Sequence, residues 1–327
     1  MTDRPMTVYV ATVGLSLFDN ILTNSRARIK DAVGKESLAK NIFHKRCEIR
    51  GPQVELADPR AEADLVSERL IKETSDQGEQ REKLETLVET IRPNQWPENL
   101  SAELASLASD RNNNHRIKTD MENDEMVVLI ASDTGPGLRS ALFNALVMTE
   151  GDVDRVDYLP DSKTPFQVAP GRVAIMRLSG LEAEDNDNFL AAMRELSGFG
   201  PHFEELLRHQ GSTCRFHLTG GFRVAMPFLL GFAQALRSLY VRVTAHARYE
   251  FSSSPRSIEL PLSSPPKNLL KGRLSGFDED GYLAESPPYE RVWEGYAYEY
   301  LPELRQWRLT PLGMALRELI PETRQEP

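Results

Sequence analysis

Two adjacent glycines, Gly220 and Gly221, interrupt the apolar stretch FHLTGGFRVAMPFLLGF at residues 216–232. A strand that ends in Gly-Gly and leads into a helix leaves backbone amides uncovered at the positive end of the helix dipole, where a phosphate group binds favourably. Arg223 adds a guanidinium that can bind phosphate oxygens in a bidentate manner. The glycines equally allow a strand and a helix to pack closely, so both roles stay open from these residues alone.

The chain lacks the glycine motifs of the common nucleotide folds. Its first predicted strand leads into VGLSLFDN rather than GxGxxG, and GxxxxGK[ST] occurs nowhere. A net charge of −10 argues against broad binding of duplex nucleic acid, so any nucleotide site must be a local basic pocket. Cys47 and Cys214 are too few for a metal knuckle or a disulfide framework and are expected to be buried. We expect neither a metal nor a cofactor.

Apolar strands alternate with amphipathic helices along the chain. This order predicts an α/β fold, a Rossmann-like, doubly wound parallel sheet whose loops at the carboxyl ends of the strands form the binding edge. Strands are expected in residues 6–14, 126–131, 155–160, 171–181 and 213–218, and helices in 16–33, 138–146, 189–199 and from the glycines to about residue 240. Three loops then carry residues suited to chemistry, namely those around Ser16, around Asp133 and Thr134, and from Thr219 to Arg223.

The domain prediction is one large domain with an appendage. Residues 1–262 form the large domain, with a helical excursion over about 74–124 marked by two apolar stripes (Leu84, Leu87, Val88 and Ile91; Leu100, Leu104 and Leu107). Residues 263–327 begin with the proline-rich linker SSPPK and end in a short strand, a turn at Pro311 and a helix. This appendage fits a winged-helix-like unit or a generic helical cap. Its 8 Lys plus Arg against 11 Asp plus Glu argue against DNA as its main partner.

Five segments, ATVGLSLFDN, NLSAELASL, VVLIASDTGPG, RLSGLEAEDNDNF and LTGGFRVAMPFLL, resemble in this order the CRISPR-associated Rossmann fold (CARF) family over about residues 7–262. The resemblance implies a homodimer that binds a cyclic oligoadenylate, the ring-shaped messenger of type III CRISPR antiviral defence, with cyclic tetra-adenylate favoured. It also implies which residues bind the ring: Gly14, Ser16, Asn20, Asp133, Thr134, Thr219, Gly220, Gly221 and Phe222, with Arg223 where many members have lysine.

Several of these residues have simpler interpretations. Ser16 can serve only as a helix cap, Asp133 only as a turn former, and Phe222 only as a core side chain. His217 and His246 are expected to be core histidines rather than catalytic bases.

Ring cleavage is the expected output, and a non-catalytic sensor is the alternative. None of the six histidines has the arginine spacing of a HEPN ribonuclease, and no separate effector enzyme is expected. A ring nuclease would cleave the messenger without metal by attack of a ribose 2′-OH, with Ser16 and Arg223 as catalytic residues. A non-catalytic sensor would instead regulate a partner or transcription through the appendage. The expected location is cytoplasmic, since no signal peptide or membrane-spanning stretch is found.

Overall fold

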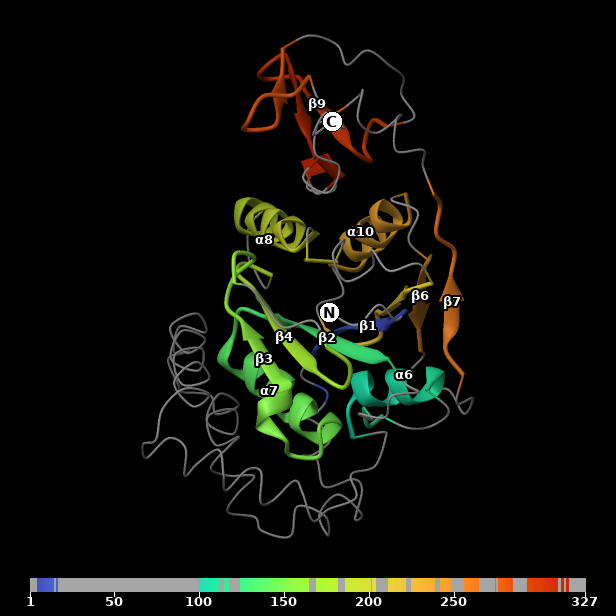
Figure 1. Ribbon diagram of the computed structural model, residues 1–327. Coiled ribbons are helices and arrows are strands. Elements are labelled where there is room, and N and C mark those ends of the chain that lie inside the picture. The colour runs from blue at the N-terminus through green and yellow to red at the C-terminus, as the bar shows by residue number, and fades with distance from the viewer. Residues whose placement is uncertain are drawn as a thin grey trace, which may run out of the picture.

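A mostly parallel sheet of seven strands forms the centre of the protein (Figure 1). The structure is a computed structural model and describes residues 5–14, 16, 100–111, 115–117, 124–164, 169–181, 186–200, 202–203, 211–221, 225–238, 242–248, 256–264, 274, 276–284, 293–310, 313–314 and 316–317. The strand order is β3-β4-β2-β1-β5-β6-β7, and only β7 runs antiparallel to its neighbour. The α/β class with a parallel sheet is therefore confirmed.

The first five strands of this sheet match the apolar runs of the sequence, whereas the last two were not predicted. Their bounds are β1 Thr7–Thr12, β2 Glu125–Ser132, β3 Val156–Leu159, β4 Val173–Leu178, β5 Thr213–His217, β6 Arg242–Ala247 and β7 Ile258–Leu260. Inner strands such as β2 and β4 are buried on both faces, which explains why they read as continuous apolar runs rather than as an alternating pattern.

Helices cover both faces of the sheet. On one face, α6 (Ala102–Asp110) and α7 (Gly135–Met148) share a core with the side chains of Tyr9, Val127 and Leu129. On the other face, α8 (Asn186–Gly198) and α10 (Met226–Ser238) pack on Val8, Val10 and the alternate residues of β2 (Figure 1). The predicted apolar stripe of Leu100, Leu104 and Leu107 lies at α6 and is buried against the sheet. The other predicted stripe, which starts at Leu84, lies outside the described residues.

The first strand lies at the centre of the sheet. Thr7 pairs in register with Glu125 of β2 on one side and with Thr213 of β5 on the other. The helices α6 and α7, before and after β2, cover one face of the sheet. The helices α8 and α10, before and after β5, cover the other face. The chain therefore changes face at β1, and such a switch point at the carboxyl ends of parallel strands is the usual ligand crevice of this architecture.

The second loop is shorter than the sequence analysis predicts. We expect a loop over residues 132–137, but β2 continues to Ser132 and α7 begins at Gly135, which leaves only Asp133 and Thr134 between them. Proline is compatible with the first turn of a helix, where its missing N–H has no intrahelical partner. Pro136 therefore starts α7 instead of prolonging the loop.

A small antiparallel sheet lies in the C-terminal part of the chain. Its strands are β8 (Tyr282–Leu283), β9 (Tyr298–Leu301) and β10 (Gln306–Leu309), in the order β8-β10-β9. Tyr298 and Leu309 belong to the same apolar core as the inner faces of α8 and α10. The hydroxyl of Tyr296 also donates a hydrogen bond to Oε1 of Gln234 in α10. The small sheet is thus packed against the helices of the large one.

His115, between α6 and β2, makes stability depend on pH. Burial first, and then Arg116 and Arg111, lower its pKa from 6.5 to about 4. The unfolded chain therefore takes up a proton on this ring at a higher pH than the folded protein does. The folded state should lose up to about 3 kcal/mol as the pH falls from about 6.5 to about 4.

We predict that His115→Gln removes this part of the acid sensitivity. Urea unfolding curves at several pH values between neutral and about pH 4 measure it, because the parent should lose stability relative to the variant as the pH falls. Curves that stay parallel over the whole range would contradict the assignment to His115.

Candidate functional site

The loops that follow β1 and β5 meet at the carboxyl edge of the sheet. The hydroxyl of Thr12 donates a 2.5 Å hydrogen bond to the carbonyl of Gly220. A Cβ atom placed on Gly14 would lie 2.7 Å from the amide nitrogen of Gly221. The hydroxyl of Ser140 in α7 also donates to the carbonyl of Gly14, at 2.9 Å. The first and third predicted loops, and the helix after the second, therefore do lie together.

Close packing explains the glycines that the sequence singles out. A Cβ atom on Gly220 would lie 2.1 Å from Oε1 of Glu103 and 2.7 Å from the carbonyl oxygen of Thr12. Gly221 has a φ of +81°, which side chains rarely permit. The close-packing role is thus established, whereas the phosphate cradle stays a prediction.

Glu103 is a site residue that the sequence analysis did not find. It is buried at the first turn of α6, and its Oε1 accepts a 2.7 Å hydrogen bond from the amide of Gly14. A carboxylate is favourable at a helix N-terminus because it complements the dipole. Here it also occupies the backbone amide of Gly14, a residue predicted to contact the ligand, and its charge opposes an anion on that side of the glycines.

Ser16 binds the start of α6 through its hydroxyl oxygen. That oxygen accepts a 3.1 Å hydrogen bond from the amide of Ala102, the first residue of α6. The amide of Leu104, two residues further along, donates a hydrogen bond to the side chain of the N-cap residue Ser101. Ser16 thus has a structural role in joining the first loop to α6, while its own hydroxyl proton is not used in this bond.

The second loop is organised around a buried ion pair. Asp133 and Arg177, at the end of β4, are both buried, and Nε of Arg177 donates to Oδ1 of Asp133 at 2.6 Å. Thr134 is the N-cap of α7 and accepts a hydrogen bond from the amide of Gly137 at 3.1 Å. Both predicted ligand residues therefore have defined structural partners, and Arg177 is a second residue that the sequence analysis missed.

Thr219 lies at the point where the third loop contacts both α6 and the end of β6. Its Oγ1 is 2.9 Å from the hydroxyl oxygen of Ser106 and accepts a 2.9 Å hydrogen bond from the amide of Arg248. The guanidinium of Arg248 donates to the carbonyl of Ala105 at 2.8 Å. Arg248 thus brings a positive charge to the third loop. Arg248 directly follows β6, a strand that the sequence analysis did not predict, so no sequence signal pointed to it.

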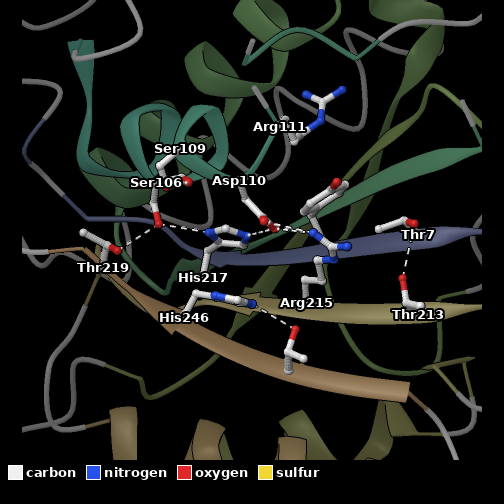
Figure 2. A network of polar contacts seen from close by, with 12 residues as sticks. Thr7, Ser106, Ser109, Asp110, Arg111, Thr213, Arg215, His217, Thr219 and His246 are labelled. Atoms are coloured by element: carbon white, nitrogen blue, oxygen red, sulfur yellow. Dashed lines mark hydrogen bonds and ion pairs between the residues drawn. The ribbon is translucent and has the colours of Figure 1, made fainter. Parts of the chain in front are cut away.

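Beneath α6, polar side chains continue from Thr219 along β5 (Figure 2). Ser106 contacts Nδ1 of His217 at 3.0 Å, and Nε2 of His217 is 3.4 Å from Oδ2 of Asp110. Burial alone would raise the pKa of Asp110, but His217 and Arg215 outweigh it and hold that pKa well below its usual range. His217 is buried, as expected for a core histidine, and its Nδ1 contacts Ser106, whereas its Nε2 has no hydrogen-bond partner among the described residues. Cys214, on the opposite face of β5, is buried too, as expected.

Several predicted residues lie outside the described part of the chain. These are Asn20, Phe222, Arg223 and Cys47. Among the described residues, no group of three or more His, Cys, Asp or Glu side chains is arranged to hold a metal ion. Within the same residues, no helix has the length and apolar character needed to cross a membrane.

Comparison with known proteins gives no match. A scan of the chain against models of protein families finds none that fits, and a search of curated proteins finds no relative. The functional argument therefore depends on the site residues themselves.

We predict that the Asp133–Arg177 pair is essential for stability. Asp133→Ala leaves the guanidinium of Arg177 buried without this carboxylate and should cost about 3–5 kcal/mol. Adding Arg177→Met should recover part of the loss, because the uncompensated charge is then gone. Denaturant unfolding measures both effects.

A second arginine–aspartate pair provides the matched control. Arg172 and Asp157 form a similar two-bond contact, with N–O distances of 2.8 and 2.6 Å, but it is more exposed to solvent. Asp157→Ala should therefore cost clearly less than Asp133→Ala. Equal losses at the two positions would contradict the importance of burial.

Proposed function

We propose that the protein binds a cyclic oligoadenylate at the carboxyl edge of β1 and β5, as a member of the CARF family. The observation that carries this proposal is the convergence of the β1 and β5 loops at the switch point, in a packing that leaves no room for a side chain at Gly14 or Gly220. These are two of the three loops for which the family resemblance implies contacts with the ring. Cyclic tetra-adenylate is the ring we favour.

Charges at this edge define where the phosphates would lie. The carboxylate of Glu103 disfavours an anion beside Gly14. On the other side of the third loop, Arg248 and the hydroxyl of Thr219 provide a cation and a polar group. Arg223 would add a second cation there. We therefore assign the phosphate contacts to the side of the third loop that faces β6.

A symmetric ring suits a symmetric pair of chains. In an isologous dimer each chain presents the same loops to one half of the ligand, so that all phosphates meet equivalent groups. The proposed functional unit is accordingly a homodimer that binds one ring.

Signal transfer to the appendage is the output with a specific observation in its favour. The chain passes from the third loop into α10, and α10 shares its core with the small C-terminal sheet, including the contact between Gln234 and Tyr296. A ligand that shifts the third loop therefore acts on an element packed against the appendage. Ring cleavage is the second output, with Ser16 and Arg223 as the proposed catalytic residues.

The first test is a calorimetric titration with the cyclic tri-, tetra- and hexa-adenylates. We expect binding of one ring per two chains. Gly220→Ala should abolish it, because the new methyl group would collide with Glu103 and Thr12. Gly276→Ala is the matched control, since its methyl group would meet only Leu283 at an ordinary 3.8 Å. The proposal fails if none of the rings produces heat or a change in mobility.

The second test concerns cleavage. Incubation of the ring in EDTA should give shorter linear adenylates with a cyclic phosphate end, because the proposed reaction needs no metal. Ser16→Ala should lower the rate more than the affinity if its hydroxyl serves the transition state. An intact ring after prolonged incubation with protein that demonstrably binds it would identify a sensor.

A further inference from the structure

The small C-terminal sheet carries an apolar row that continues beyond the core. Trp307 of β10 pairs with Tyr300 of β9 on one side and with Leu283 of β8 on the other, so these three side chains share one face. Tyr298 and Leu309, two residues further along their strands, lie on the same face and are buried in the core. The row therefore begins in the core and ends at Tyr300 and Trp307, whose ring centroids lie 5.1 Å apart.

The outer end of this row is open to solvent. Tyr300 is 42% exposed, and Leu304 in the turn between β9 and β10 is 57% exposed. Within the described part of the chain, Ile258 is the only other large apolar side chain that is exposed. We call Tyr300, Leu304 and the half-buried Trp307 the hairpin patch. Because Tyr and Trp are enriched among the residues that dominate the energetics of protein interfaces, this cluster is typical of a binding surface.

The turn that carries Leu304 is held by its own backbone. The amide of Leu304 donates to the carbonyl of Leu301 at 3.2 Å, and the amide of Arg305 donates to the carbonyl of Pro302 at 3.4 Å. Arg305 has a φ of +52°, a region that glycine adopts more readily than a residue with a side chain. The backbone cost of an arginine here favours a role for its side chain. A patch that is already ordered also loses little conformational freedom on binding.

The charges around the hairpin patch cancel. Glu303 and Arg305 are both exposed and flank Leu304 in the turn. The other two charges of the hairpin, Glu299 and Arg308, lie on the opposite face and form an ion pair with an N–O distance of 2.6 Å. A chain with a net charge of −10 repels a second copy through its summed field, and this repulsion is weakest at a locally neutral surface.

A second copy of the chain fits this pattern better than an unlike partner. In an isologous contact the same patch meets itself about a two-fold axis. With the axis at Leu304, Glu303 of each copy can pair with Arg305 of the other, while the apolar side chains bury surface between them. A strongly basic or acidic partner would find no excess of opposite charge here.

We propose that the hairpin patch is an isologous contact between two copies of this chain. The strand β9 lies beyond α8 and α10, away from the large sheet (Figure 1). The contact needs no ligand and goes beyond the proposed function, in which two chains share a ring at the carboxyl edge of the large sheet. With three apolar side chains from each copy, the interface is small and should be weak unless another surface holds the chains together.

Cysteine cross-linking of the whole chain tests this contact. Leu304→Cys places a thiol at the proposed axis, where air oxidation can join it to the same residue of a second copy. This variant should give a two-chain species on a non-reducing gel. Ile258→Cys is the matched control, because Ile258 is 63% exposed but lies on β7 of the large sheet. The parent chain reports any linkage through Cys47 or Cys214. Equal linkage of the two variants, or none at Leu304→Cys, would overturn the proposal.

Exchange of the two charges tests the two-fold arrangement. In the Leu304→Cys background, Glu303→Arg or Arg305→Glu alone should slow linkage by about tenfold, because like charges then face each other across the axis. Glu303→Arg also lowers the net negative charge of the chain, so general repulsion predicts the opposite effect. The two changes together restore opposite charges and should recover the original rate. A double variant that stays as slow as the single ones would contradict the isologous pairing.

Arg305→Gly separates folding from association. Glycine relieves the positive φ, so the midpoint of urea unfolding should not fall. Linkage in the Leu304→Cys background should nevertheless slow, because one member of each charge pair is gone. Unchanged linkage would overturn the role assigned to Arg305. None of these measurements uses a ring, so their failure leaves the proposed function intact, and absence of ring binding would leave this inference intact.

Discussion

The close approach of the β1 and β5 loops is the constraint on which the site depends. Thr12 and Gly220 are joined by a hydrogen bond, and Gly14 touches the backbone of Gly221. Two backbones can pack this closely only where neither carries a Cβ atom. This contact sets the position of the third loop, of Thr219 within it and of the start of the segment that leads into α10. Any ligand at this edge must therefore meet groups that the packing has already positioned.

The short helix α6 organises the same edge from the side. The hydroxyl oxygens of Ser16 and Ser101 accept hydrogen bonds from the amides of Ala102 and Leu104 at the start of this helix. The carboxylate of Glu103 accepts a hydrogen bond from the amide of Gly14. The helix thus occupies the backbone amide of Gly14 in the first loop. Its remaining polar residues connect the glycines to His217 and Asp110 beneath it. The candidate site is consequently a three-part assembly of two loops and one helix.

The sequence predicts the strands and the convergence of the loops well, and the partners of individual side chains poorly. Apolar runs locate β1, β2 and β5, and the carboxyl-end rule brings Gly14 and Gly220 together. The pairing of Asp133 with Arg177 depends on the register between β2 and β4, which no local pattern reveals. Glu103 and Ser106 were missed for another reason. Their spacing matches a buried face, but polar residues on a helix are ordinarily interpreted as solvent-exposed.

The central place of β1 also has a consequence for how the chain folds. Thr7 and Thr213 are neighbours in the sheet although 206 residues separate them. On a ribosome β1 is made before β5, and its partner on this side follows only 206 residues later. Until then it keeps an unpaired apolar edge, and contacts of such long sequence separation form slowly. Correct assembly of this protein should therefore be sensitive to chaperones that shield β1 until β5 has been made.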